Sequence, residues 1–145
     1  MRHASDHEPL RMRNLFVDVA IGDWVVPSAD GERIGHIIER TSAFVRRASF
    51  EGDRFEADAL AANIDVVFLV HALGSPPNQR RLERELVLAF DSGAEPAVLL
   101  TKVDTVDDPE PGRAELAEVA LGVPVLLASG LAGIGIEPIR AYARG

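Results

Sequence analysis

Three short apolar runs constrain the fold of this chain more than any other feature of its sequence. They are DVVFLV at 65–70, AVLL at 97–100 and VPVLLAS at 123–129. Each run has the length of a strand and lacks polar alternation, which is typical of strands that helices cover on both faces. Amphipathic segments separate the runs, as in right-handed βαβ units. The sequence therefore predicts an α/β fold with a three-stranded parallel sheet over 65–70, 97–101 and 123–128.

The segments between and after these runs carry helix signals. Residues 78–93 place four apolar side chains on one helical face, with charged side chains opposite and Gly93 as the stop. Helices are also predicted over 109–121 and 136–144, the last with Pro138 in its first turn. The apolar residues of the first helix are Leu82, Leu86, Ala89 and Phe90. Its charged residues, which we expect to be solvated, are Arg80, Arg81, Glu83, Arg84 and Glu85.

The first third of the chain has the pattern of antiparallel strands. The stretch NLFVDVAIGDWVV at 14–26 contains two short apolar runs, and Asp30 and Gly31 favour a tight hairpin turn. Further apolar residues continue to Val45. We predict a small antiparallel unit of three or four strands, which are too few to close a barrel. Trp24 is expected to pack in the core of this unit.

Charge is unevenly distributed along the chain. The net charge is −8; residues 1–54 carry eight arginines and nine carboxylates, whereas residues 55–145 carry seven basic and fourteen acidic side chains. The acidic part repels phosphate backbones, so any nucleic-acid contact is expected from residues 1–54, called the front below.

The absence of cysteine excludes disulfides and thiolate metal sites, and no apolar run approaches the roughly 20 residues that span a bilayer. We expect a cytoplasmic protein without membrane contact. The histidines, which lack metal-ligand spacing and are expected to be structural or solvated, are His3, His7, His36 and His71.

Polar residues follow the carboxyl ends of the predicted strands, where open α/β sheets bind ligands. The TKVD segment at 101–104 follows the second strand and holds the only lysine among fifteen basic residues. A carboxylate at Asp104 can accept hydrogen bonds from the ring N–H and the exocyclic amine of guanine, a pair that adenine does not offer. Lys102 can lay its methylene stem along the base. Thr101 can tie neighbouring loops together.

The third strand is followed by SGLAG at 129–133, where a backbone N–H near Gly130 can donate to the guanine carbonyl. The alternative is that TKVD forms a polar strand-to-helix turn in which Asp104 caps a helix. The lone lysine, the strand-end position and the SGLAG segment favour base recognition. Asp107 and Asp108 are expected to serve the start of the next helix rather than to bind a cation.

Much of the chain resembles the ribosome small-subunit-dependent GTPase A family (RsgA/YjeQ). The similarity starts at about residue 15, in the order AIGDWVV, TSAFVRR, EADALAANIDVVFLV, NQRRLERELVLAFDSGAEPAVLLTKVD and VPVLLASGLAGIGIEPIRAY. The family consists of circularly permuted GTPases whose base motifs precede the phosphate loop. The resemblance implies that Thr101, Lys102, Val103 and Asp104 match the Asn/Thr-Lys-x-Asp base motif. It also implies that Ser129, Gly130 and Leu131 match the second base loop, which usually reads Ser-Ala-Leu.

The resemblance also implies an organisation, ligands and a partner. Residues 1–50 are expected to be the C-terminal part of an OB-fold-like domain. Residues 51–145 are expected to be the first half of a circularly permuted GTPase domain, half of a P-loop GTPase-type sheet with three βα units. The implied ligand is GTP or GDP, held through its base, and the implied partner is the small ribosomal subunit with its rRNA. Arg46 and Arg47 are candidate RNA contacts, and we expect a monomer.

Three parts of the family pattern do not occur in the 145 residues. There is no G-x-x-x-x-G-K-[ST] loop for phosphates, no Asp followed three residues later by Gly, and no Cys/His zinc region. Mg and Zn are therefore expected only in missing parts of the family protein. No catalytic residue is assigned, and the chain alone is predicted to be inactive as a GTPase.

We expect an internal piece of such a protein, or a truncated reading frame. One alternative is a non-catalytic interaction module in which an OB-like RNA contact is fused to a βαβ scaffold. The other is the tail of a conventional-order GTPase, against which the OB-like front argues.

Overall fold

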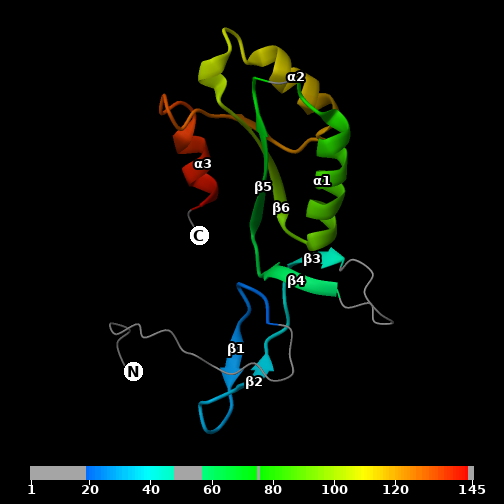
Figure 1. The fold of residues 1–145 in the computed structure, drawn as a ribbon, viewed down its shortest axis with the longest axis vertical. Helices are drawn as coiled ribbons and strands as arrows, with labels where there is room; N and C mark the ends of the chain where they lie inside the picture. Colours follow the sequence, from blue (N-terminus) through cyan, green and yellow to red (C-terminus); the bar gives the residue numbers. More distant parts are fainter. Residues whose placement is uncertain (1–18, 48–56, 75, 144–145) are drawn as a thin grey trace.

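The computed structural model describes residues 19–47, 57–74 and 76–143 (Figure 1). The parallel sheet and its helices form a larger part at one end, and small strand pairs lie toward the other end. No helix in these ranges is long and apolar enough to cross a lipid bilayer. Residues 14–18 of the first predicted strand, and His3 and His7, lie outside the described residues.

The parallel sheet has three strands in the order β5-β6-β7, and its prediction is confirmed. The pairing of β5 with β6 is parallel and runs from Val66 opposite Glu95 to Ala72 opposite Thr101. The pairing of β6 with β7 is also parallel. The carboxyl ends of all three strands therefore lie at one edge. The strands are β5 (Val66–Ala72), β6 (Glu95–Thr101) and β7 (Val125–Leu127).

Helices cover both faces of this sheet. Helix α1 begins after Asn78, whose side-chain oxygen accepts a hydrogen bond from the Arg81 N–H, and ends at Gly93 in the left-handed conformation. Tyr142 of α3 meets Phe68 of β5 edge to face, with ring centroids 5.8 Å apart. Figure 1 shows α1 and α3 on opposite sides of the sheet. The helices are α1 (Gln79–Ser92), α2 (Glu110–Val119) and α3 (Ile136–Tyr142).

The main core lies between the sheet, α1 and α2. Leu82, Leu86 and Ala89 are buried as predicted, but Phe90 is 50% exposed, so the prediction for Phe90 is wrong. Phe90 lies about 100° around the helix from Ala89, which carries it past the edge of the buried stripe. The buried core residues are Leu69, Leu73, Leu82, Leu86, Ala89, Val98, Leu100, Val103 and Leu116.

The predicted antiparallel unit is present as two separate two-stranded sheets. In the second, Ala43 lies opposite Ala62 and Arg47 lies opposite Ala57, so this pair crosses position 50. The sequence does not predict β4 as a strand, and the boundary between residues 50 and 51 stays a prediction. The strands are β1 (Val25–Pro27), β2 (Ile34–Ile37), β3 (Ala43–Arg47) and β4 (Ala57–Ala62).

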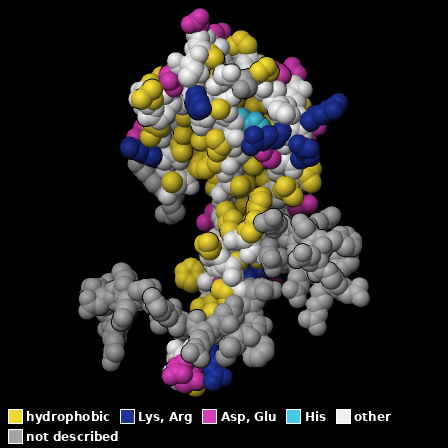
Figure 2. Space-filling model, viewed as in Figure 1, with side chains coloured by type: hydrophobic (Ala, Val, Ile, Leu, Met, Phe, Trp, Pro, Cys, Tyr) yellow, Lys and Arg dark blue, Asp and Glu magenta, His cyan; other side chains and the backbone are white. Residues whose placement is uncertain are grey.

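Trp24 is 68% exposed, so the prediction that it packs in a core is wrong. Its carbonyl accepts a hydrogen bond from the Ile38 N–H at 2.8 Å, and Val26 lies two residues along, on the same face. Val26 and Ile38 are also about half exposed. A hairpin of two strands buries little of its own surface, which explains the exposure. Figure 2 shows hydrophobic side chains on the surface of the narrow region that holds β1 and β2 in Figure 1.

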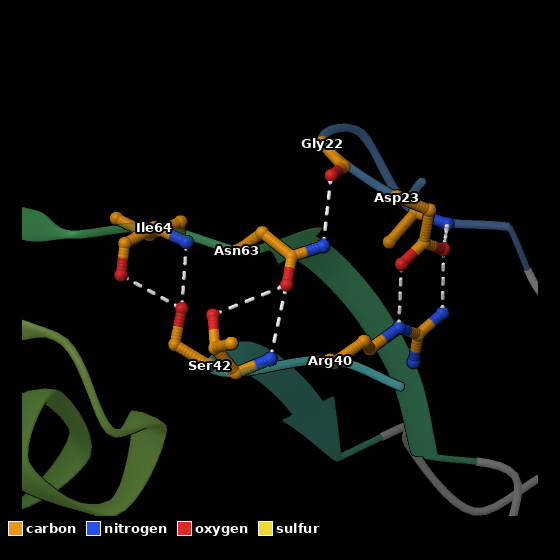
Figure 3. A network of polar contacts seen from close by, with 8 residues as sticks. Gly22, Asp23, Arg40, Ser42, Asn63 and Ile64 are labelled. Atoms are coloured by element: carbon orange, nitrogen blue, oxygen red, sulfur yellow. Dashed lines mark hydrogen bonds and ion pairs between the residues drawn. The ribbon is translucent and has the colours of Figure 1, made fainter. Parts of the chain in front are cut away.

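A polar network joins the front strand pairs to the chain that enters the parallel sheet (Figure 3). Asn63 has a left-handed backbone, with φ 54°. Its Oδ1 accepts from the Thr41 N–H at 2.9 Å, and its Nδ2 donates to the Gly22 carbonyl at 3.0 Å. The Ser42 hydroxyl donates to the Ile64 carbonyl at 2.7 Å and accepts from the Ile64 N–H at 2.6 Å. Three segments that are distant in sequence are thereby held together.

Asp23 and Arg40 form a bidentate salt bridge at the same junction. The Arg40 Nε lies 2.7 Å from Oδ1, and its Nη2 lies 2.7 Å from Oδ2. The Ala20 N–H donates to Oδ2, also at 2.7 Å. The Asp23 side chain is fully buried, and Arg40 is 27% exposed. Hydrogen bonding from Arg40 lowers the pKa of Asp23 below its ordinary value, against the opposing effect of burial.

Candidate functional site

The segments that follow β5, β6 and β7 meet at the carboxyl edge of the sheet. The Leu73 N–H donates to the Thr101 carbonyl at 2.9 Å, which joins the first segment to the second. The Val103 N–H donates to the Ala128 carbonyl at 3.3 Å, which joins the second to the third. The two sequence segments predicted to recognise a base therefore lie side by side.

Lys102 and Asp104 are both exposed, and they flank the buried Val103. Lys102 has a left-handed backbone, with φ 59° and ψ 37°, and a short 3-10 helix (Val103–Thr105) follows it. Among the described residues, neither the ammonium of Lys102 nor the carboxylate of Asp104 has a hydrogen-bond partner. Both groups are thus free to bind a ligand.

The helix-cap alternative for Asp104 does not match the structure. No side chain caps the 3-10 helix. Helix α2 begins at Glu110, six residues after Asp104. The carboxylate that accepts a hydrogen bond at the start of α2 is that of Asp108, from the Glu110 N–H at 3.0 Å. The expected helix-start role of Asp108 is confirmed.

Thr101 ends β6, and its hydroxyl donates to the His71 carbonyl on β5 at 3.1 Å. The hydroxyl therefore ties the ends of two neighbouring strands rather than two loops, and a role of Thr101 in base recognition stays a prediction. His71 itself is buried, and its Nε2 lies 2.9 Å from the Glu85 Oε2. The structural role expected for His71 is confirmed. The prediction that Glu85 is solvated is wrong. Its side chain is only 25% exposed, and it forms a salt bridge with Arg81.

The segment after β7 folds back on itself around Ser129. The Ser129 backbone exchanges two hydrogen bonds with Ile134, and its hydroxyl accepts from the Ala132 N–H at 2.9 Å. Ser129 is buried, whereas Gly130 is exposed and Leu131 is 92% exposed. Among the described residues, the Gly130 N–H has no hydrogen-bond partner. It is therefore available as a donor at the tip of this turn.

Arg46 and Arg47 lie on β3, far along the chain from the segments described above. Their backbones pair with Asp58 and Ala57 of β4. Their side chains lie outside the described part of the structure, so the RNA contact stays a prediction.

Thr105 belongs to the site but was not expected from the sequence. Its N–H donates to the Lys102 carbonyl at 3.0 Å. The only signal in the sequence is a hydroxyl residue directly after TKVD. Within the described ranges, no group of three or more histidine and carboxylate side chains is arranged to hold a metal ion.

The family described as RsgA GTPase matches residues 37–145. The chain belongs to the RsgA GTPase family. The resemblance found in the sequence is thereby confirmed, although the family match does not test the role of any single residue.

Named relatives and a solved structure agree with this membership. The small ribosomal subunit biogenesis GTPase RsgA of Methanosarcina acetivorans is 35% identical over 126 residues, which are 84% of this chain and 34% of that protein. The RsgA of Streptomyces avermitilis is 38% identical over 144 residues, which are 96% of this chain and 37% of that protein. The crystal structure of YjeQ from Thermotoga maritima matches with a TM-score of 0.63 and 26% identity, over 88% of this chain and 44% of that chain.

The chain spans little more than a third of the length of these RsgA relatives. Its antiparallel pairs and its three-stranded parallel sheet with helices resemble part of YjeQ.

Proposed function

We propose that this chain recognises the guanine base of GTP or GDP, as part of a protein that acts in biogenesis of the small ribosomal subunit. The observation that carries the proposal is the pair of exposed side chains, Lys102 and Asp104, that have no partner among the described residues. They lie on a turn that is hydrogen-bonded to the neighbouring segment through Val103 and Ala128.

The chemistry of these groups suits guanine. The Asp104 carboxylate accepts from the ring N–H and the exocyclic amine, and the Lys102 stem lies along the base. The free N–H of Gly130 donates to the guanine carbonyl. Thr101 and Ser129 are already hydrogen-bonded within the protein, so they hold these groups in place rather than reach the ligand.

Family membership supports a wider role. The named relatives are small ribosomal subunit biogenesis GTPases, so GTP hydrolysis, the small subunit as partner and a cytoplasmic location are part of the proposal. In this proposal, residues 1–50 belong to an OB-fold-like domain and 51–145 to the first half of a circularly permuted GTPase domain. Phosphate and Mg²⁺ contacts would then come from sequence that these 145 residues do not contain, as would Zn²⁺ ligands.

Nucleotide titrations of the purified chain test base recognition. GDP should shift the amide resonances of 101–104 and 129–131 at millimolar concentrations, and ADP should not. Asp104→Asn should lose the preference for guanine, by about tenfold or more, because the amide presents a donor where guanine also presents one. Asp107→Asn, a matched change of an exposed carboxylate, should retain it. Equal binding of GDP and ADP by the unaltered chain would refute the proposal.

Lys102→Arg tests the role of the stem separately. An arginine keeps the charge and part of the stem but replaces the compact ammonium with a planar fork. The affinity for GDP should fall less than in Asp104→Asn, and the preference over ADP should persist. A larger loss in Lys102→Arg would assign recognition to the ammonium rather than to the carboxylate.

A second candidate is a non-catalytic module whose front contacts rRNA. The observation that favours it is the exposed face with Trp24, Val26 and Ile38, in a region of nearly balanced charge. Aromatic and basic side chains together suit single-stranded RNA. If the front binds rRNA, replacing Arg46 and Arg47 with alanine should weaken binding and reduce the salt dependence by about one unit of slope per lost phosphate contact. If the affinity for rRNA does not change, Arg46 and Arg47 do not contact the RNA.

A further inference from the structure

Thr105 fastens the turn that carries Lys102 and Asp104. Its N–H donates to the Lys102 carbonyl at 3.0 Å. Its hydroxyl oxygen lies 2.8 Å from the same carbonyl and 3.3 Å from the Leu73 carbonyl. Because a hydroxyl has one proton, the two carbonyls share it or receive it in turn. Thr105 therefore connects the turn to the segment that follows β5.

Leu73 receives contacts from both ends of this turn. Its N–H donates to the Thr101 carbonyl at 2.9 Å, and its own carbonyl faces the Thr105 hydroxyl. The Thr101 hydroxyl donates to the carbonyl of His71, two residues before Leu73. The three residues between the two threonines thus form a turn that is attached at both ends to the same neighbouring segment.

Lys102 depends on this attachment because its backbone is left-handed. Residues with a β-carbon rarely adopt this conformation and keep it only where their surroundings enforce it. The Lys102 side chain is exposed and makes no hydrogen bond to a described residue, so it does not enforce its own conformation. The peptide unit that follows it is held on both sides: its carbonyl accepts from the N–H and the hydroxyl of Thr105, and the Val103 N–H donates to the Ala128 carbonyl at 3.3 Å.

We propose that Thr105 is a positioning residue for base recognition. Its hydroxyl keeps the Lys102 backbone left-handed, so that the lysine stem and the Asp104 carboxylate address the same ligand. This inference rests on the proposed function of the site. A turn that is ordered before the ligand arrives costs less to order on binding, so loss of the hydroxyl lowers the affinity for the base.

Two substitutions isolate the hydroxyl. Thr105→Val keeps the branched shape and removes the hydroxyl, and Thr105→Ser keeps the hydroxyl. Thr41→Val is the matched control, because the Thr41 hydroxyl also has a hydrogen-bond partner, Asn63 at 3.2 Å, but lies at the junction of the front strands.

The first measurement is amide hydrogen exchange, which needs no ligand. Exchange at 101–105 should be about five- to tenfold faster in Thr105→Val than in the unaltered chain, since one hydrogen bond of ordinary strength is lost. Thr105→Ser and Thr41→Val should exchange like the unaltered chain in this segment.

The second measurement is the ratio of GDP to ADP affinity, which a merely structural tie would not change. Thr105→Val should bind GDP about fivefold more weakly and show a smaller preference over ADP, and Thr105→Ser should restore both. Unchanged exchange and unchanged affinity in Thr105→Val would overturn the proposal. Faster exchange with an unchanged ratio would overturn the role in recognition and leave a structural tie.

The unaltered chain separates this inference from the function on which it rests. If it does not prefer GDP to ADP, the proposed function fails, and the role of Thr105 in recognition fails with it. If it prefers GDP and Thr105→Val retains the full preference, only the inference about Thr105 fails.

Discussion

Asn63 and Lys102 both have a left-handed backbone without being glycine, and each is held differently. Asn63 uses its own side chain, which bonds to Thr41 and Gly22. Lys102 has no such side-chain contact; its carbonyl accepts from Thr105, and the next N–H, that of Val103, donates to Ala128. Such conformations cost about 1–3 kcal/mol each, so the hydrogen bonds around them must offset this free energy. Single side chains at these two turns therefore determine local geometry that neither helix nor strand propensity specifies.

Asp23 makes the stability of the chain depend on pH. Hydrogen bonding from Arg40, with help from the Ala20 N–H, holds the pKa of Asp23 below its ordinary 3.8 in the folded chain. A depressed pKa stabilises the fold above the unfolded value, and this contribution disappears as the pH falls through the folded value. The free energy of unfolding should therefore drop as the pH is lowered below about 4.

Urea unfolding at a series of pH values measures this effect. Asp23→Asn should lower stability at neutral pH and flatten the acid decrease. Asp30→Asn is the control: hydrogen bonding from Ser28 also lowers the pKa of Asp30, but in an exposed turn, so its flattening should be smaller. An acid decrease in Asp23→Asn as steep as in the unaltered chain would contradict the assignment.

At the scale of elements, the sequence predicts the parallel-sheet part well and the front less well. Strands β5, β6 and β7 are visible as apolar runs because buried parallel strands need no polar alternation. Strand β4, ADALAA, contains no β-branched or aromatic residue, so its pairing with β3 decides its conformation. Trp24 could not be placed from its type, since its burial depends on whether another element covers its face.

The position of the site was predictable, and so was a tie made by the Thr101 hydroxyl, but the support that Thr105 gives was not. Strand order alone brings the segments at 101–104 and 129–131 to one edge, and the structure shows them adjacent. The contact of Thr105 with Leu73 depends on the register of β5 against β6, which the sequence does not specify. Hydroxyl partners of this kind become visible only in three dimensions.

Alanine should destabilise the chain at one glycine of the segment after β7 and have little effect at another. Gly135 has φ 68°, and an added Cβ would overlap the Leu127 carbonyl, whereas the space around Gly130 is open. Gly135→Ala should destabilise the chain by about 2 kcal/mol or more, because the backbone must shift as well as adopt a strained φ. Gly130→Ala should change stability by less than about 0.5 kcal/mol.

Thermal and urea unfolding of the two variants test this contrast. Gly133→Ala adds a useful third case, since Gly133 has φ 71° but nothing within 4 Å of an added Cβ. It should lie between the other two. Equal stability of Gly135→Ala and Gly133→Ala would mean that backbone strain, and not the overlap with Leu127, sets the cost.

At the scale of the whole molecule, the proposed function separates base recognition from phosphate chemistry. Neither a phosphate-binding loop nor the Asp-x-x-Gly motif occurs in the 145 residues. Positioning of the phosphates and of Mg²⁺ carries most of the catalysis in phosphoryl transfer. The purified chain should therefore release phosphate from GTP no faster than buffer. Turnover that Asp104→Ala abolishes would contradict this expectation, because it would tie hydrolysis to this chain's own base site.

The network around Asn63 should make the two parts of the molecule unfold together. It connects the loop at Gly22 and the segment at Thr41 to Asn63, which precedes β5. The front strand pairs are therefore fixed to the larger part by hydrogen bonds and not only by the covalent chain. The chain offers a separate probe for each side. Its single tryptophan, Trp24, lies in the front, and the described α helices all lie in the larger part.

Asn63→Ala should uncouple these two probes in urea unfolding. It removes the bonds to Thr41 and Gly22 and leaves a left-handed residue without support, at a cost of about 2–3 kcal/mol. Trp24 fluorescence should then change at a lower urea concentration than the helical circular dichroism signal, whereas in the unaltered chain the two should coincide.

Two further variants serve as controls. Asn63→Gly should recover about 1 kcal/mol of the lost free energy of unfolding, since glycine adopts the left-handed conformation easily but cannot form the side-chain hydrogen bonds. Asn78→Ala, which removes the cap of α1, should cost about 1 kcal/mol and keep the transitions together. Coincident transitions in Asn63→Ala would show that the strand pairs are held by contacts other than this network.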